Sequence, residues 1–113
     1  MADSNKQPEN DTLARIDKLV DAVDYQAGAV ASKTLIDKET GTIILFAFAK
    51  GQALPAHTAP FDIMISILEG QADLVVAGKS YILNAGEMIT IPAKNPHSLK
   101  AVKPFKMMMV MVK

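Results

Sequence analysis

The sequence predicts a small all-β domain in which antiparallel strands form a sandwich or barrel. After Gly28, short runs rich in β-branched and aromatic residues are separated by Gly, Pro, Asn or Asp at intervals of roughly ten residues. At 113 residues, the chain is long enough for one domain with its own core, and a second domain would not fit. Its hydrophobic fraction of 50%, with 6 Gly and 6 Pro, is typical of a globular protein.

The amino-terminal part is expected to hold a polar tail and one short helix. Residues 1–11 are charged or small and contain Pro8, so we expect a mobile tail without chemistry. From Thr12 to Asp24, apolar residues recur at spacings of three and four, which is typical of an amphipathic helix. These residues are Leu13, Ile16, Val20 and Val23. Residues 12–113 then form the single predicted domain.

Eight β-rich runs follow this helix and are expected to be the strands of the domain. They are residues 29–36, 42–49, 61–68, 72–76, 79–83, 88–91, 97–101 and 105–112. Short segments that each contain Gly, one of them together with Asn, interrupt the runs, and these two residue types favour turns. The predicted turns are residues 39–41, 69–70, 77–78 and 84–86.

Two of the expected strands are apolar on both faces. Residues 63–68 place isoleucine on one face and Met64 and Leu68 on the other, and residues 107–112 include no polar side chain. A strand face that is open to water should carry polar residues. The outer face therefore needs a cover, which is either the amino-terminal helix or a second subunit, and we expect a homodimer.

Charge and composition exclude several classes of partner. The 12 Lys and Arg residues balance 12 Asp and Glu residues, and no basic cluster with interleaved aromatics occurs. Binding to nucleic acid or to a membrane is therefore not expected. The chain has no Cys, so His, carboxylate, amide and water are the available metal ligands. The amino terminus has no apolar stretch of the signal-peptide kind, and we expect a cytoplasmic protein.

His57, one of two histidines in the chain, stands in a segment that resembles the first sequence motif of the cupin superfamily. That motif runs G, five residues, H-x-H, three or four residues, E, six residues, G. Gly51, His57 and Gly70 match it at the correct spacing. Ala59 stands at the position of the second His and Ile63 at that of the Glu. Two positions that hold metal ligands in cupins are thus replaced.

His97, the other histidine, stands in a segment that is similar to the second cupin motif. That motif runs G, five residues, P-x-G, two residues, H, three residues, N. Gly86, Pro92 and His97 match it, whereas Lys94 replaces the glycine and Ala101 replaces the asparagine. The resemblance covers most of the chain.

The resemblance implies the cupin double-stranded β-helix, a jelly-roll barrel of the RmlC-like type, here preceded by one short helix. In cupins the H-x-H pair, the Glu and the late His converge inside the barrel on one divalent metal. Two of these four ligands are retained. On a regular strand, residues 57, 59 and 63 share the inward face, and the late His enters from a neighbouring strand. The ligand pocket is therefore expected to be lined by His57, Ala59, Ile63, Ile65 and His97.

A divalent metal, namely Mn, Fe, Ni or Zn, is the cofactor that such a pocket would take. Two imidazoles alone bind it weakly and need a carboxylate to complete a two-histidine, one-carboxylate face. Asp62 is the nearby candidate. As the neighbour of Ile63 it should face outward on a regular strand, but a bulge caused by Pro60 would turn it inward. The alternative is that Asp62 caps a backbone amide or faces solvent.

Three functional hypotheses follow, and the sequence does not choose among them. The first is a small-molecule-binding cupin in which His57 and His97 fix the polar end of a modest organic ligand. The second is a metal-dependent isomerase, decarboxylase or dioxygenase that acts on a small carbonyl or hydroxy-acid substrate. The third is a sensory or structural dimer with a vestigial metal site, because one fold hosts many activities.

Overall fold

Antiparallel strands make up almost all of the regular structure in the computed structural model, which describes residues 14–113. The strands are β1 (Val30–Lys38), β2 (Gly41–Phe48), β3 (Ala53–His57), β4 (Asp62–Val76), β5 (Lys79–Asn84), β6 (Met88–Ile91), β7 (His97–Lys100) and β8 (Phe105–Val112). The predicted all-β fold class is confirmed. In residues 14–113, no helix has the length and hydropathy that crossing a membrane requires.

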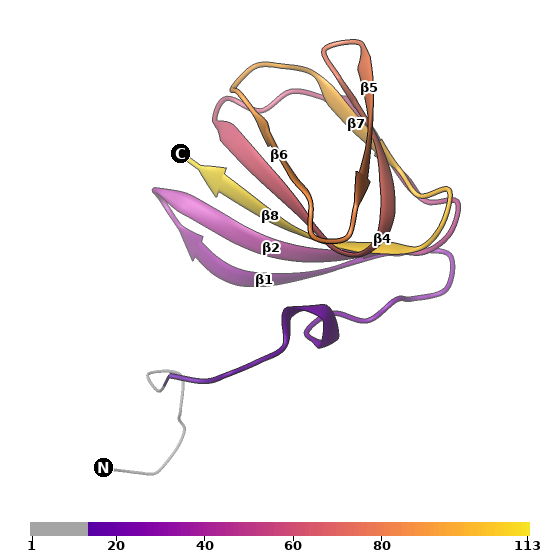
Figure 1. Ribbon diagram of the computed structural model, residues 1–113. Coiled ribbons are helices and arrows are strands. Elements are labelled where there is room, and N and C mark those ends of the chain that lie inside the picture. The colour runs from indigo at the N-terminus through magenta and orange to yellow at the C-terminus, as the bar shows by residue number, and fades with distance from the viewer. Residues whose placement is uncertain (1–13) are drawn as a thin grey trace.

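The strands are hydrogen-bonded in the order β1-β2-β8-β4-β7-β3, and β5 and β6 pair with β4. The 15 residues of β4 serve both halves of the fold. Its first part pairs with β8 and β6, and its second part pairs with β5 and β7. Figure 1 shows the resulting sheet curled into a barrel-like shape, which is consistent with the cupin jelly roll.

The turn predicted at residues 69–70 is a bend within one strand. Separate strands were expected on either side of it, whereas β4 continues through both segments. Gly70 has a φ of +79°, and the register between β4 and β8 shifts between Ile67 and Glu69. A Cβ atom at Gly70 would lie 2.3 Å from the carbonyl oxygen of Pro104. Glycine is therefore required here both for its positive φ and for the close approach of two backbones.

β3 is a strand that the sequence analysis did not predict. It contains Pro55, which has no backbone N–H to donate to a neighbouring strand. β3 lies at the end of the strand order and, within residues 14–113, pairs only with β7. Proline is tolerated on such an edge strand because one side of the strand needs no partner.

The core lies between the two halves of the curled sheet. The rings of Phe48 and Phe105 stack at its centre, with centroids 4.5 Å apart and an interplanar angle of 13°. The buried set is completed by aliphatic side chains from β4 to β8 and the segment after β7. These are Ile63, Ile65, Ile67, Ala72, Leu74, Leu83, Ile91, Leu99, Ala101, Met107 and Met109.

The predicted amino-terminal helix is wrong for the described part of its range, and the predicted tail lies outside the described residues. Residues 14–24 contain a single 3-10 turn at Leu19–Asp21 and no α-helix. Ile16 is 98% exposed, whereas Val23 is buried against Leu45 and Ala47 on the outer face of the sheet. Residues 20–25, which we name the strap, thus cover part of that face without being helical.

A group of polar contacts holds the strap on the sheet. The buried Lys106 donates a 2.5 Å hydrogen bond to the Val20 carbonyl oxygen, and its Nζ lies 5.1 Å from the centroid of the Tyr25 ring. The Tyr25 hydroxyl donates to Glu69 Oε2 at 2.6 Å. Partial burial, together with the hydrogen bond to Glu69 and its negative charge, raises the pKa of Tyr25. The hydroxyl therefore stays protonated and keeps its role as a donor.

Candidate two-histidine site

His57 and His97 lie opposite each other on β3 and β7. Their ring centroids are 4.3 Å apart, and the ring planes are inclined by 59°. His97 is 1% exposed, whereas His57 is exposed to solvent. The two imidazoles that the motif spacing brings together are therefore adjacent, and one of them is accessible from outside.

Both rings use the same nitrogen in the same kind of hydrogen bond. Nδ1 of His57 lies 2.9 Å from the carbonyl oxygen of Pro55, and Nδ1 of His97 lies 3.0 Å from that of Asn95. A carbonyl oxygen only accepts, so a neutral imidazole in this position carries its proton on Nδ1 and its lone pair on Nε2. Nε2 of His97 is buried and has no hydrogen-bond partner among residues 14–113. Because buried polar atoms normally have a partner, this atom is a point at which a ligand would be stabilised.

The aliphatic residues predicted to line the pocket come from separate elements. Residues 57, 59 and 63, for which an inward face was expected from regular strand alternation, do not lie on one strand, since β3 ends at His57 and β4 begins at Asp62. Ala59 lies between the two strands and packs against the core. Ile63 and Ile65 on β4 are buried members of that core. Ile63 and Ile65 are therefore packed in the core and do not form the wall of an open pocket.

Asp62 caps a backbone amide. Its Oδ1 accepts a 2.8 Å hydrogen bond from the N–H of Ala93. Asp62 pairs with Val112 and precedes the buried Ile63, so it belongs to the outer face of the sheet, as regular strand alternation predicts. This geometry corresponds to the alternative role given to Asp62 in the sequence analysis. Within residues 14–113, no three His, Asp or Glu side chains are grouped so that they could hold a metal ion.

Comparison with known proteins identifies the family. The family model of the cupin domain matches residues 44–113. The chain belongs to the cupin family. None of the curated proteins matches this cupin.

Solved structures support the same assignment. A conserved protein of unknown function from Streptococcus pyogenes is 33% identical, with a TM-score of 0.85, and the match covers 93% of this cupin and 92% of that chain. A cupin 2 conserved barrel domain protein from Leptotrichia buccalis is 35% identical, with a TM-score of 0.81. That match covers 83% of this cupin and 46% of the Leptotrichia chain. A cupin superfamily protein from Desulfitobacterium hafniense, at 24% identity and a TM-score of 0.76, shares the fold.

At Lys94 the backbone of this cupin adopts a left-handed conformation that favours glycine. Lys94, which stands in place of the glycine of the second motif, has a φ of +70°. Its N–H donates a 2.8 Å hydrogen bond to the Ala59 carbonyl oxygen, which joins the loop before β7 to the loop after β3. The next residue, Asn95, supplies the carbonyl that orients His97. The left-handed conformation of Lys94 therefore helps to position the buried imidazole.

We expect Lys94→Gly to raise the free energy of unfolding by about 1 kcal/mol, because a positive φ strains a residue with a Cβ and does not strain glycine. Urea denaturation followed by circular dichroism measures the change. Lys79→Gly at the start of β5 is the matched control, and it is expected to be destabilising because Lys79 has no positive φ. A loss of stability in Lys94→Gly would contradict the expectation.

The carbonyl groups of Pro55 and Asn95 are site groups that the sequence analysis missed. Each lies two residues before its histidine, and each segment contains a proline, Pro55 itself or Pro96. A proline restricts the backbone around it to extended conformations. A proline just before each histidine is therefore the sequence signal that could have indicated a fixed carbonyl.

A divalent metal, which many cupins bind, fits this site in part. Metal-bound histidines commonly donate through the other ring nitrogen to a carbonyl oxygen, and both imidazoles here have that arrangement. The side chains of residues 14–113 place no third imidazole or carboxylate with them as a metal-binding group. The described residues thus supply two imidazole nitrogens as metal ligands. The other coordination positions of a bound metal would be filled by groups from elsewhere.

Proposed function

We propose that this cupin binds a small organic molecule with a hydroxyl or carboxyl group, and that His57 and His97 hold this polar end. The observation that carries the proposal is the buried Nε2 of His97, which has no hydrogen-bond partner in the described part of the chain. A hydroxyl or protonated carboxyl group would donate to its lone pair and would remove the energetic penalty of the unpaired acceptor, about 1–3 kcal/mol.

The geometry of the pair supports a ligand that enters from the side of His57. His57 is exposed and lies 4.3 Å, centroid to centroid, from the buried ring of His97. A ligand that reaches His97 would therefore contact both imidazoles. Because Ile63 and Ile65 are packed in the core, the ligand that we propose is small.

A divalent metal enzyme is the second candidate, and the matching Nδ1 hydrogen bonds favour it. His57 and His97 would hold Mn, Fe, Ni or Zn through Nε2. A bound metal acts as a Lewis acid that polarises a carbonyl or hydroxyl oxygen. Since both imidazoles are neutral ligands, the metal would keep its positive charge and favour anionic oxygens of the substrate. This candidate corresponds to an isomerase, decarboxylase or dioxygenase acting on a small carbonyl or hydroxy acid.

NMR spectra of the imidazoles test the two candidates. The untagged chain is titrated with small hydroxy and keto acids, first without metal and then with Zn²⁺. Shifts of both histidines without metal support the first candidate, and shifts that require Zn²⁺ support the second. His57→Ala and His97→Ala are each expected to weaken binding by about tenfold or more, and the neighbouring Thr58→Ala is expected to leave it unchanged.

Two results would count against the proposal. Binding that both histidine variants retain would mean that the ligand lies elsewhere. Absence of binding under all these conditions would favour the third hypothesis, a structural or sensory protein with a vestigial site. His97 is buried, so circular dichroism must show that its variant is folded, and the exposed His57 supplies an independent variant.

A further inference from the structure

A row of residues across four strands connects the two histidines with a lysine. His57 on β3 lies opposite His97 on β7. His97 also lies opposite Val76 on β4, and Val76 lies opposite Lys79 on β5. Figure 1 shows β5 and β7 beside the second half of β4. Because residues that are directly opposite in neighbouring strands share a face of the sheet, these four side chains belong to one face.

This row lies on the inner face of the barrel. Leu99, Leu74 and Tyr81, each two positions along a strand from a member of the row, lie in the core or pack against it. Residues two apart on a strand point the same way. Lys79 therefore stands on the same face as His97, and the Cα atoms of the two residues are separated by two strand spacings, roughly 10 Å.

The ammonium group of Lys79 is directed along this inner face. Its Nζ lies 5.5 Å from the centroid of the Tyr81 ring, which packs against the core. The face of an aromatic ring attracts a cation, so the ring holds the ammonium on the inner side of the sheet. The ion pair formed among residues 14–113 joins Arg15 and Asp17, and no carboxylate of that range pairs with Lys79. The ammonium is thus available to an anionic ligand.

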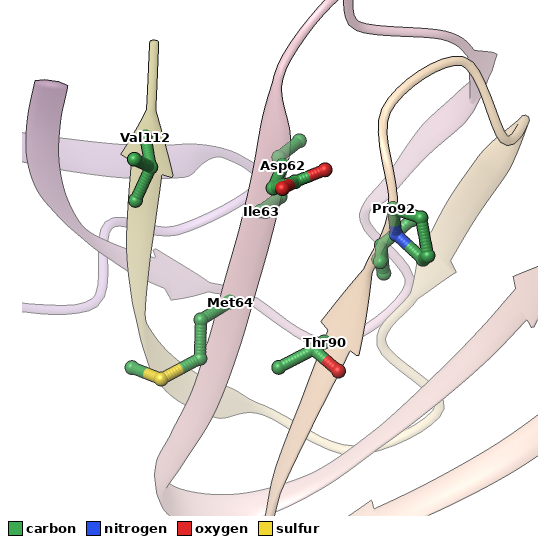
Figure 2. A pocket seen from close by; sticks show the side chains of 7 residues that line it. Asp62, Ile63, Met64, Thr90, Pro92 and Val112 are labelled. Atoms are coloured by element: carbon green, nitrogen blue, oxygen red, sulfur yellow. The ribbon is translucent and has the colours of Figure 1, made fainter. Parts of the chain in front are cut away.

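The described strands around the histidines present no carboxylate to the inner face. On β3, β5, β7 and the part of β4 that pairs with β5, the carboxylate is that of Asp73, which faces outward because its neighbour Leu74 is buried in the core. Asp62 at the start of β4 also belongs to the outer face, where Figure 2 shows it with Met64 and Val112 beside a pocket. A ligand on the inner face would therefore meet the lysine ammonium and no negative charge, which favours an anion.

We propose that the ligand of the two-histidine site is a short hydroxy acid, whose hydroxyl group binds the histidines and whose carboxylate binds Lys79. This inference rests on the proposed function, since it takes Nε2 of His97 as the acceptor for the hydroxyl group. Val76 lies between His97 and Lys79 in the row and is partly buried, so it offers an apolar surface to the carbon atoms that join the two groups. Lys79 is then the residue that selects an acid over a neutral analogue, because a hydrogen bond between charged groups is stronger than one between neutral groups.

Binding of 3-hydroxybutyrate and of its neutral amide, 3-hydroxybutanamide, to the full untagged chain without metal tests this inference. The two probes share the hydroxyl group and the carbon chain and differ in charge. We expect the wild-type chain to bind the acid about tenfold more tightly than the amide, and Lys79→Gln to lose this preference while its affinity for the amide stays unchanged. NMR titration of the imidazole signals measures both affinities.

Lys100→Gln is the matched control. Lys100 lies on β7 beside β4, is exposed, and faces outward because its neighbour Leu99 is buried in the core. The substitution removes the same charge from the opposite face of the sheet, so we expect this variant to keep the preference for the acid. Lys79 is itself exposed, and circular dichroism of Lys79→Gln is expected to show an intact fold.

Equal affinity of the wild-type chain for the two probes would overturn the inference. A preference for the acid that Lys79→Gln retains would also overturn it, because the carboxylate would then be held elsewhere. In both cases the proposed function stands if His57→Ala still weakens binding. Absence of binding by both probes would overturn the inference as well, and the wider titration with hydroxy and keto acids then decides the proposed function by itself.

Discussion

Gly70→Ala is expected to lower the free energy of unfolding by about 3 kcal/mol or more. The φ of +79° strains any residue with a Cβ, and the new Cβ would lie 2.3 Å from Pro104 O and 3.0 Å from the Phe105 Cα. Both contacts are with backbone, which cannot rotate away as a side chain can. Phe105 also stacks on Phe48 in the core, so a shift of its backbone would disturb the packing. Urea denaturation followed by circular dichroism measures the loss.

Gly78→Ala separates the two causes. Gly78 has a φ of +82°, but a Cβ there would have no atom of the described residues within 4 Å. This variant therefore carries backbone strain without a clash, and we expect it to lose about 1 kcal/mol. Equal losses in the two variants would show that the contact with Pro104 does not matter.

Ala59→His is expected to raise the affinity of the chain for Zn²⁺ or Ni²⁺ by about tenfold or more. Ala59 lies two residues after His57 and packs against the core, and its carbonyl is bonded to the loop that leads to His97. A third imidazole at this position would add a ligand to the two whose Nε2 atoms are available. Isothermal titration calorimetry of the untagged proteins measures the difference.

Thr58→His supplies the comparison for the added imidazole. Thr58 is exposed, whereas Ala59 is partly buried against the core. A new histidine at position 58 would increase the histidine content without facing the pair, and no comparable gain is expected. An equal gain in the two variants, or no gain in Ala59→His, would mean that position 59 does not face the site.

The strands were predictable because each is specified by local residue patterns. β-Branched runs and intervening Gly residues placed most of them within a few residues of their observed bounds. Two elements were predicted wrongly because contacts between distant segments decide them. The sequence Glu69-Gly70 is typical of a turn. In the structure Glu69 and Gly70 pair with Lys106 and Phe105 of β8, so β4 continues through them. β3 contains Pro55, and only its place at the edge of the sheet makes a strand possible.

The prediction of an amino-terminal helix was wrong because the spacing of apolar residues does not show which surface they will pack against. A helix through residues 12–24 would use the Val20 carbonyl as an internal acceptor. In the structure Lys106, 86 positions later in the sequence, donates to that carbonyl instead. Val23 packs against apolar residues of β2, whereas Ile16 is 98% exposed among the described residues. The sheet thus supplies contacts that local propensity cannot represent.

For the candidate site, the sequence predicted the two histidines but not the groups around them. The motif spacing indicated that His57 and His97 would meet, and their rings are adjacent. It could not show that Nδ1 of each ring bonds to a carbonyl, because that depends on backbone direction in two proline-containing segments. Regular strand alternation correctly placed Asp62 on the outer face, and the Ala93 amide that it caps comes from a distant loop.

The central position of β8 has a consequence for how the molecule assembles. β8 follows every other strand in the sequence, yet it lies between β2 and β4 in the sheet. Until β8 is in place, one edge of β2 and one edge of the first part of β4 stay unpaired. Such edges invite pairing with other chains, and long-range pairing is slow. Chains in which β8 has not yet inserted are therefore expected to aggregate more readily than folded chains.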